Sequence, residues 1–382
     1  MKNILLAVDA WYPQMGGPNV VLANYYKYLS ENNEVTAAVP SYGRETDERV
    51  DRETGVPVMH VRSVYIPIGG FRNCVPGLDG ALRQRAKQAD IFHAHSPFAL
   101  GNYFANAAKK YDKPSVLTFH TKFKDEFMRY THSKVCTAIM MHRIMSVINK
   151  TDYVWTVSNG AAQTLREYGY KGDITIIRNG TDMTVPENAR ELVDRVNEKY
   201  GLADEENVLL FVGRVVQTKN LKLVFFALKK LNGSVPFKMV VVGDGEGMKE
   251  YRQMVLEYGL GDRVLFVGEV TDRQFLKAFY LRADLFVFPS VFDTASLCPI
   301  EAAAFGLPTL LVKDSPTSEI IRDGFSGYAV PADADEWAER LKYILSDKSA
   351  LAAVRENCRR YVYRSWKDVV AEAEAEYDKL LR

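Results

Sequence analysis

The stretch ADLFVFPSVFDTASLCPIEAAAFGLPTLLV, residues 283–312, contains a complete strand–loop–helix–strand pattern. Its two ends, 284–289 and 309–312, are short apolar runs of the kind that form strands buried on both faces of a parallel sheet. Two parallel strands need a crossover connection, and the small residues between the runs suit a helix there. The stretch therefore predicts a parallel sheet covered by helices.

The same alternation of apolar runs and helical patterns extends along the whole chain. We expect further strands at 3–8, 34–39, 90–95, 115–120, 152–157 and 173–178 in the first half, and at 208–213, 238–243 and 263–268 in the second. Repeated strand–helix units predict doubly wound α/β sheets, and this many strands suit two sheets better than one.

The length of the chain also favours two domains, because 382 residues exceed one ordinary domain. The highly charged segment 183–207 has no buried-strand pattern, so the boundary is expected there. We expect an N-terminal domain over 1–183, a C-terminal domain over 184–364 and a final helix over 365–382.

Composition and charge narrow the class of protein. Apolar residues make up 47% and charged residues 25%, as in soluble globular proteins. The net charge of +1 argues against nucleic-acid binding. Residues 1–182 carry 22 Lys and Arg against 17 Asp and Glu, so the N-terminal half is the better candidate for an anionic surface. We expect no signal peptide and no membrane-spanning segment, because the chain lacks an apolar run of about 18 residues.

The cysteines indicate a reducing compartment. Cys74, Cys136, Cys298 and Cys358 are far apart and lack the CxxC spacing of metal sites. Free thiols in the cytoplasm, with no bound metal, are the simplest interpretation.

Candidate site residues follow the predicted strands, because ligands of open α/β sheets bind beyond the carboxyl ends of the strands. In the first half, Gly16 and Gly17 precede a helical pattern, and backbone amides there suit an anion or a sugar. A loop whose backbone conformation needs glycine explains the two residues equally well. His120 ends a strand. His93 and His95 lie on one face of another strand, where a metal is conceivable, but no further ligand follows at suitable spacing, which favours hydrogen-bonding or acceptor-side roles.

The second half carries cations and carboxylates at equivalent positions. Arg214 follows a strand directly and Lys219 comes five residues later, a pattern that suits a diphosphate. Asp293 and Glu301 are eight positions apart, around a stretch without charge. The two carboxylates suit the vicinal hydroxyls of sugars. A general acid–base pair is the competing interpretation. Glu301 could also be present only because an acidic residue near a helix N-terminus stabilises the helix dipole.

These elements together resemble retaining glycosyltransferases of family 4, which have the GT-B fold. The resemblance covers nearly the whole chain. The first half carries GGPNVVLANYYKYL, DIFHAHSP, SVLTFHT, VSNGAAQTL and IIRNGTD, and the second half carries FVGR, VVGDGE, ADLFVFPS, EAAAFGLPTLL and RDGFSGY.

The resemblance implies two Rossmann-like domains that face each other across a cleft, with the final helix crossing back to the first domain. It also implies a nucleoside-diphosphate sugar, a UDP-sugar by expectation, as co-substrate, with no cofactor and no metal. By similarity, Arg214 and Lys219 hold the diphosphate, Glu301 binds the ribose and Asp293 contacts the transferred sugar. The other implied donor-site positions are Gly16, Gly17, His120, Gly243, Ser296 and Leu297.

Two positions depart from the family pattern at the sugar end of this site. Asp293 stands where the family usually has Glu, and Ser296 stands where Gly is common. The resemblance implies retaining, metal-independent transfer of a hexose to a hydroxyl acceptor, such as a diacylglycerol, a glycolipid or a cell-envelope glycan.

The segment 120–150 bears on the acceptor. Residues 122–150 carry six Lys and Arg against two Asp and Glu, with apolar residues between them. Sequence of this type also resembles family members that act on diacylglycerol, and it is compatible with peripheral association with anionic lipid at the inner face of the plasma membrane. An ordinary helix with its apolar face in the core is the favoured interpretation.

Three other classes of function compete with a transferase. A sugar-nucleotide epimerase shares the architecture but lacks the Arg–Lys–acid–Glu set found here. A sugar-nucleotide-binding protein with weak or no activity is the non-enzyme alternative, supported by the two departures at Asp293 and Ser296. A hydride-transferring oxidoreductase is excluded by the lack of a GxGxxG turn.

Overall fold

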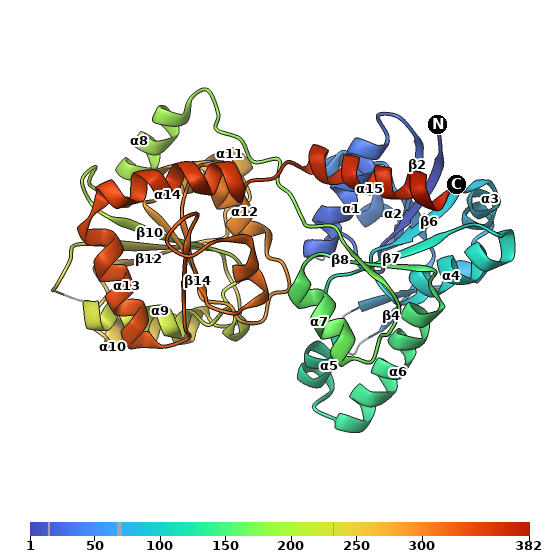
Figure 1. Cartoon of the computed structure of the whole chain (residues 1–382), viewed down its shortest axis with the longest axis horizontal. Coiled ribbons are helices and arrows are strands. Elements are labelled where there is room, and N and C mark those ends of the chain that lie inside the picture. Colours follow the sequence, from blue (N-terminus) through green and yellow to red (C-terminus); the bar gives the residue numbers. More distant parts are fainter. Residues whose placement is uncertain (14–15, 67–70, 232) are drawn as a thin grey trace. The chain divides into compact units, whose positions relative to one another are not determined.

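The computed structural model describes residues 1–13, 16–66, 71–231 and 233–382. They form two compact units, one made of Met1–Asn179 with Trp366–Arg382 and the other of Gly180–Ser365. Each unit contains a parallel sheet with helices packed around it (Figure 1). The prediction of two Rossmann-like α/β sheets is therefore confirmed.

The N-terminal unit contains a seven-stranded sheet of order β3-β2-β1-β6-β7-β8-β9, in which every pairing is parallel. Its strands are β1 (Asn3–Ala7), β2 (Glu34–Pro40), β3 (Met59–Val61), β6 (Ile91–Ala94), β7 (Ser115–Phe119), β8 (Tyr153–Thr156) and β9 (Ile174–Ile176). The strand order reverses between β1 and β6. In a doubly wound sheet, ligands bind at the carboxyl ends of the strands that flank such a reversal.

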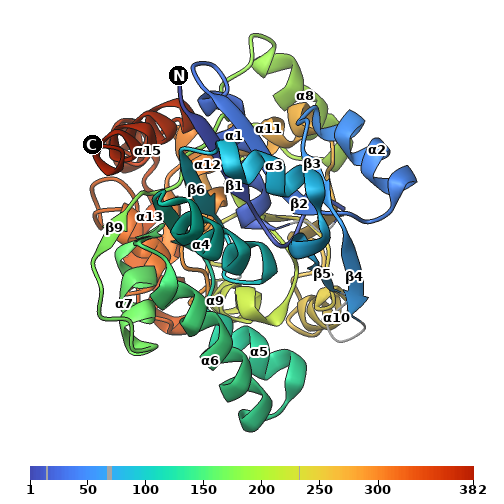
Figure 2. The same ribbon diagram turned by 90° about the vertical axis from the view of Figure 1, so that its right-hand side faces the viewer.

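Helices connect these strands and cover the sheet. They are α1 (Gly17–Leu29), α2 (Arg44–Thr54), α3 (Gly80–Gln88), α4 (Ala99–Tyr111), α5 (Phe123–Thr131), α6 (Lys134–Lys150), α7 (Asn159–Glu167) and the C-terminal α15 (Trp366–Leu380). Helix α15 packs on α1, as both ribbon views show (Figures 1 and 2). Glu374 of α15 accepts hydrogen bonds from Lys2 Nζ at 3.1 Å and Asn33 Nδ2 at 2.7 Å. The predicted return of the final helix to the first domain is confirmed.

The C-terminal unit repeats this topology with six parallel strands in the order β12-β11-β10-β13-β14-β15. The strands are β10 (Val208–Val212), β11 (Lys238–Val242), β12 (Val264–Gly268), β13 (Leu285–Phe288), β14 (Thr309–Val312) and β15 (Tyr328–Val330). The helices are α8 (Ala189–Tyr200), α9 (Leu221–Leu231), α10 (Met248–Glu257), α11 (Arg273–Arg282), α12 (Leu297–Ala304), α13 (Ala334–Ser346) and α14 (Lys348–Tyr361). Here the strand order reverses between β10 and β13.

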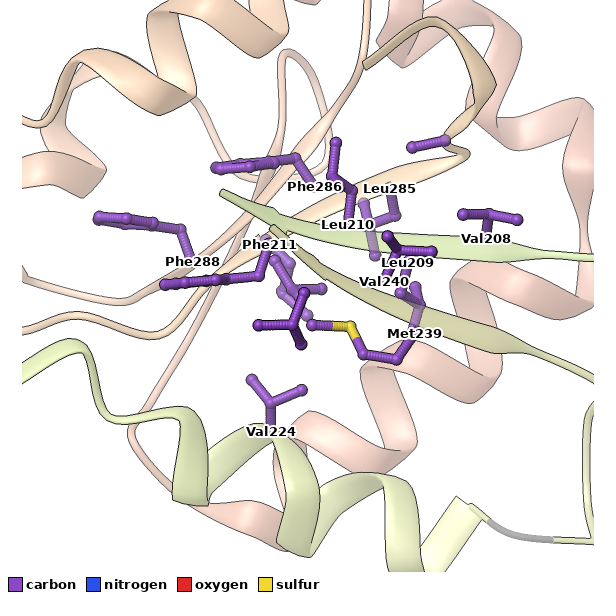
Figure 3. Close-up of a cluster of buried hydrophobic side chains, with 14 of the residues drawn as sticks. Val208, Leu209, Leu210, Phe211, Val224, Met239, Val240, Leu285, Phe286 and Phe288 are labelled. Carbon is purple, nitrogen blue, oxygen red and sulfur yellow. The ribbon is translucent and has the colours of Figure 1, made fainter. Parts of the chain in front are cut away.

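The core of this unit explains why its strands are apolar on both faces. Figure 3 shows side chains of β10, β11 and β13 packed together, with Val224 of α9 reaching toward Met239. The rings of Phe211 and Phe288 stack with their centroids 6.1 Å apart. Helices cover both faces of the sheet, so the residues of β10, β13 and β14 lose contact with water whichever way they point. This burial is the main source of stability.

The structure adds elements that sequence patterns did not predict. The short strands β3 and β15 extend the two sheets, and β4 (Ser63–Ile66) pairs with β5 (Phe71–Cys74) in a separate antiparallel hairpin. The charged segment 183–207, in which the domain boundary is expected, contains α8. Leu192 and Val196 of this helix are buried in the core of the C-terminal unit.

None of the helices in the described part of the chain combines the length and the apolar character that crossing a bilayer requires.

Candidate active site

The reversal point of the C-terminal sheet brings together two loops that are distant in the sequence. Strands β10 and β13 are parallel neighbours, so their following loops leave the same edge of the sheet. Ser290 Oγ in the second loop donates a hydrogen bond to the carbonyl oxygen of Thr218 in the first, at 3.2 Å. Asn220 Nδ2 donates to the carbonyl oxygen of Pro289 at 3.4 Å. These hydrogen bonds tie the predicted cation loop to the predicted carboxylate loop.

Lys219 and Asp293 form an ion pair in this position. Lys219 Nζ lies 2.5 Å from Asp293 Oδ1, and the side chains are only 14% and 21% exposed. The ammonium also lies 5.1 Å from the centroid of the Phe288 ring. The second carboxylate oxygen, Asp293 Oδ2, is buried and has no hydrogen-bond partner among the described residues. A buried acceptor without a partner costs free energy, so it marks a place where a ligand hydroxyl is stabilising.

Arg214 differs from Lys219 in its surroundings. Its side chain is exposed, and no carboxylate of the described residues lies within ion-pair distance. It follows Gly213 directly after β10, at the same sheet edge as Lys219. An exposed guanidinium at this edge can bind an oxyanion with two parallel hydrogen bonds.

The side chain of Glu301 in α12 is only 14% exposed, and a tyrosine orients it. Tyr280 Oη of α11 donates a hydrogen bond to Glu301 Oε2 at 2.9 Å, while Arg273 lies 3.9 Å from Oε1. Burial raises the pKa of the Glu301 carboxyl, and Arg273 and Tyr280 act in the opposite direction. The Tyr280 ring stacks on Phe305 at 5.5 Å, which fixes its hydroxyl. One oxygen of Glu301 is therefore held by the protein, and the other faces only a more distant, exposed arginine.

Helix α12 begins beside these carboxylates. Ser296 occupies its N-cap position without making a side-chain capping hydrogen bond, and Leu297 is its first residue. The N-terminus of a helix attracts negative charge because its first amides have no partner within the helix. Cys298 is in the same turn, and burial raises the pKa of its thiol to about 12. A thiol that stays protonated at neutral pH is a poor nucleophile.

Position 243 requires glycine because of its backbone conformation and the neighbouring backbone. It follows β11 with φ of +129°, and an added Cβ would lie 2.0 Å from the carbonyl oxygen of Gly213. The close approach of these two loops therefore explains the glycine without a ligand. Gly16 and Gly17 are different. They precede and begin α1, and an added Cβ would meet no atom of the described residues closer than 3.7 Å.

The reversal point of the N-terminal sheet has its own polar centre. Asp9 follows β1, and its carboxylate accepts hydrogen bonds from Ser96 Oγ at 2.7 Å and from the backbone amide of Leu100 at 2.8 Å. Leu100 is in the first turn of α4, so Asp9 caps that helix from another part of the chain. Burial raises the pKa of the Asp9 carboxyl to about 6, while its hydrogen bonds oppose this shift. Asp9 is not among the residues predicted from the sequence, although its place directly after the first strand was a usable signal.

Three histidines form a row beside this centre. The rings of His93 and His95 stack at 4.3 Å, and His95 Nδ1 lies 3.1 Å from Nε2 of His120. His93 Nδ1 lies 2.5 Å from Tyr377 Oη of α15, and its Nε2 lies 2.7 Å from Thr118 Oγ1. Burial lowers the pKa of both His93 and His120 to about 3. All three rings are therefore neutral at pH 7, which suits hydrogen bonding better than charge stabilisation.

The sequence predicts no metal at the pair His93 and His95. Among the described residues, no group of three or more His, Cys, Asp or Glu side chains has an arrangement suited to a metal ion. His93 instead joins the sheet to the C-terminal helix. The partners Thr118, Tyr377 and Tyr280 had no signal in the sequence, because each contact joins distant segments.

Comparison with known proteins identifies the family. The family model described as "Glycosyl transferases group 1" matches residues 193–364, and the model described as "Glycosyltransferase Family 4" matches residues 15–185. One match falls in each unit, and together they leave out only residues 1–14, which include β1, and residues 186–192 and 365–382. The chain belongs to the group 1, family 4 glycosyltransferases, as its sequence motifs predicted. The predicted enzyme class, a transferase of glycosyl groups, is confirmed.

Individual relatives agree with this assignment. The chain is 24% identical to the alpha-monoglucosyldiacylglycerol synthase of Streptococcus pneumoniae, over 85% of this chain and 74% of that protein. It is also 24% identical to a GDP-mannose-dependent alpha-mannosyltransferase of Corynebacterium glutamicum, over 90% and 81%. Among solved structures, Anabaena HepE in complex with UDP superposes with a TM-score of 0.79 at 18% identity, over 99% of this chain and 100% of that chain. This last similarity supports the predicted GT-B fold.

Proposed function

We propose that this enzyme transfers a hexose from a UDP-sugar to the hydroxyl of a lipid acceptor, with retention of the anomeric configuration. The observation that carries the proposal is the buried Asp293 Oδ2, which has no partner among the described residues and belongs to a carboxylate already paired with Lys219. A sugar hydroxyl supplies the missing donor. The neighbouring cations and the N-terminus of α12 suit the diphosphate of the same ligand.

The donor is proposed to lie along the loops at the edge of the C-terminal sheet. Glu301 binds the ribose hydroxyls through the oxygen that Tyr280 leaves unoccupied. Arg214 and Lys219 bind the diphosphate, helped by the backbone amide of Leu297. Asp293 contacts the transferred hexose, with Ser296 beside it.

Two sets of relatives support the choice of donor and acceptor. HepE has been crystallised with UDP and, separately, with UDP-glucose. The relative from Streptococcus pneumoniae is named for the synthesis of a diacylglycerol glycolipid, and a second relative, from Acholeplasma laidlawii, has the same name. The mannosyltransferase relative is named for GDP-mannose, so GDP-mannose is the competing donor in any test.

The proposed reaction breaks the bond between the sugar C1 and the diphosphate oxygen and forms one between C1 and the acceptor oxygen. The acceptor proton passes to a phosphate oxygen of the leaving nucleotide. Arg214, Lys219 and helix amides stabilise the negative charge that develops there, which is the largest effect expected in such a site. His120, neutral at pH 7, is proposed as a hydrogen-bonding partner of the substrate on the N-terminal unit. Because protein cations neutralise the diphosphate, the reaction is proposed to need no metal and no cofactor.

The test combines a binding assay with a transfer assay. Calorimetry should show that UDP and UDP-glucose bind more tightly than GDP and GDP-mannose. With UDP-glucose and diacylglycerol in mixed micelles, a glycolipid with an α-linkage should form, and an excess of EDTA should not prevent this. Slow hydrolysis of the donor without any acceptor separates a transferase from a protein that only binds nucleotide sugars. An intact donor after prolonged incubation with every acceptor would support the binding protein instead.

A further inference from the structure

His95 and His120 meet where two neighbouring strands end. His95 follows β6 directly and His120 follows β7 directly, and these two strands are parallel neighbours in the sheet. His95 Nδ1 lies 3.1 Å from His120 Nε2, and the planes of the two rings differ by only 25°. The contact is a hydrogen bond between two imidazole rings, so the tautomers of the rings decide which nitrogen donates.

Burial keeps both rings neutral and so limits the arrangements. The side chain of His95 is 2% exposed, and burial lowers its pKa well below 6.5. Burial also lowers the pKa of His120 to about 3. A neutral imidazole has one N–H and one bare nitrogen. The shared hydrogen therefore belongs either to His95 Nδ1 or to His120 Nε2.

The other ring nitrogen of His95 distinguishes these two arrangements. His95 Nε2 is buried and has no hydrogen-bond partner within the part of the chain that the structure describes. If His120 were the donor, His95 would carry its own hydrogen on Nε2, as a buried N–H without an acceptor. If His95 donates from Nδ1, Nε2 is a bare nitrogen instead. Buried N–H groups without an acceptor are rarer in folded proteins than acceptors without a donor, so His95 is the favoured donor.

The packing around His95 holds its ring in this orientation. The ring of His93 stacks on it at 4.3 Å, and the ring of Tyr25 meets it edge-on at 5.1 Å. His93 is itself held from two sides, by Tyr377 Oη at 2.5 Å and Thr118 Oγ1 at 2.7 Å. A flip that exchanged the two nitrogens of His95 would have to disturb this packed group of rings.

We infer that His95 is a positioning residue that sets the tautomer of His120, so that His120 carries its hydrogen on Nδ1 and acts as a donor. The inference rests on the proposed function only where it makes an oxygen of the substrate the group that accepts from Nδ1. It goes further than that proposal because it states the direction of the hydrogen bond and the residue that enforces it.

The test determines the tautomers in the full chain labelled with isotope-labelled histidine. Couplings between the ring nitrogens and the carbon-bound ring protons distinguish a protonated nitrogen from a bare one in magnetic resonance spectra. The spectrum of His120→Gln identifies the signals of His120 by their absence. In the wild type, His95 and His120 should each be protonated on Nδ1 and bare on Nε2.

Two substitutions of His95 separate the hydrogen bond from the packing. In His95→Asn the side-chain amide lies where Nδ1 lies now, whereas in His95→Gln it lies one bond further out, near the position of Nε2. His95→Asn should keep the Nδ1 tautomer of His120 and most of the turnover with UDP-glucose. His95→Gln should release His120 to the other tautomer and lower turnover about tenfold, the effect of one lost hydrogen bond. The matched control is His142→Gln, since His142 is exposed on α6 and should not affect either measurement.

Three outcomes would overturn the inference. They are a wild-type His120 protonated on Nε2, a His120 tautomer that does not change in His95→Gln, and an equal loss of turnover in both variants without any change of tautomer. The wild-type spectrum decides the first of these even if a variant fails to fold, which circular dichroism checks. Calorimetric titration with UDP tests the proposed function separately. A wild type with the expected tautomers that neither binds UDP nor cleaves UDP-glucose would contradict the proposed function alone.

Discussion

Lys219 Nζ lies 2.5 Å from Asp293 Oδ1, although 74 residues separate the two in the sequence. The pair joins the residue assigned to the diphosphate with the residue assigned to the transferred sugar. Each holds the other in a partly buried position, and Asp293→Asn keeps an amide oxygen that can still accept a hydrogen bond from Lys219. On the proposed assignment, the charge of Lys219 lies between the leaving diphosphate and a hydroxyl of the transferred sugar.

Substitutions of Glu301 and Asp293 should change the affinities for different ligands. Glu301→Gln should weaken UDP and UDP-glucose about equally, because both ligands carry the ribose. Asp293→Asn should leave UDP almost unchanged and weaken UDP-glucose about tenfold or more, since a lost charge-assisted hydrogen bond costs roughly 1.5–3 kcal/mol. Calorimetric titration of both ligands against both variants measures this difference. Unchanged affinities with reduced rates in both variants would instead indicate a general acid–base pair.

Removal of either cation, Arg214 or Lys219, should mainly lower turnover. Arg214→Ala and Lys219→Ala should each lower the rate of transfer on the order of 100-fold, because negative charge develops on the leaving diphosphate. Lys222→Ala is the matched control. Lys222 is in the following helix, and its Nζ pairs with Glu250 at 2.5 Å. The control should keep its activity, and wild-type turnover in either test variant would show that the phosphate site is misassigned.

The buried histidines should make stability depend on pH. His93 is fully buried and its pKa falls to about 3, below its ordinary value of 6.5, because burial disfavours the charged ring. Between these values the unfolded chain binds the proton and the folded chain does not. The contribution of His93 to the free energy of unfolding is therefore fully present above pH 6.5. It falls by about 1.4 kcal/mol for each pH unit below that value.

Urea unfolding of wild type and His93→Gln between pH 7.5 and 5 measures this slope. The variant should lose stability less steeply on acidification, whatever its stability at pH 7.5. Asp9, whose pKa is raised, acts in the opposite sense below pH 6, but it is present in both proteins and cancels in the comparison. Identical slopes would mean that His93 is not kept neutral by burial.

Gly243 should tolerate a side chain less well than Gly268. Both have positive φ, +129° and +85°, which disfavours alanine by roughly 1–2 kcal/mol. An added Cβ meets nothing within 4 Å at Gly268, whereas at Gly243 it lies 2.0 Å from the Gly213 carbonyl oxygen. Gly243→Ala should therefore lose roughly 1–3 kcal/mol more than Gly268→Ala in urea unfolding. Equal losses would show that the two loops can separate at little cost.

The elements that sequence patterns predicted are those whose signal is local. Strands such as β10 and β13 have apolar residues on both faces, and this composition is visible in any window of the chain. The three-residue strands β3 and β15 were missed, whereas β9, which is equally short, was predicted because it lies in the longer apolar run 173–178. The hairpin was missed for a different reason, since its apolar residues are exposed and the usual rule assigns apolar runs to a core.

The site was predictable in part for the same reason. Arg214, Lys219, Asp293 and Glu301 follow strands in the sequence, and strand ends gather at one edge of a parallel sheet. Their partners were not predictable. Tyr280 comes from another helix, and no spacing rule relates it to Glu301.

The sequence by itself determined the two doubly wound sheets and the residues at their carboxyl ends, because apolar periodicity and the place of polar residues after strands are properties of neighbouring positions. Only the tertiary structure decided which of those residues touch. The hydrogen bond from His93 to Tyr377 spans 284 positions, and the ion pair from Lys219 to Asp293 spans 74. Such contacts depend on the strand order and on how helices pack across the sheet, which no short stretch of the chain encodes.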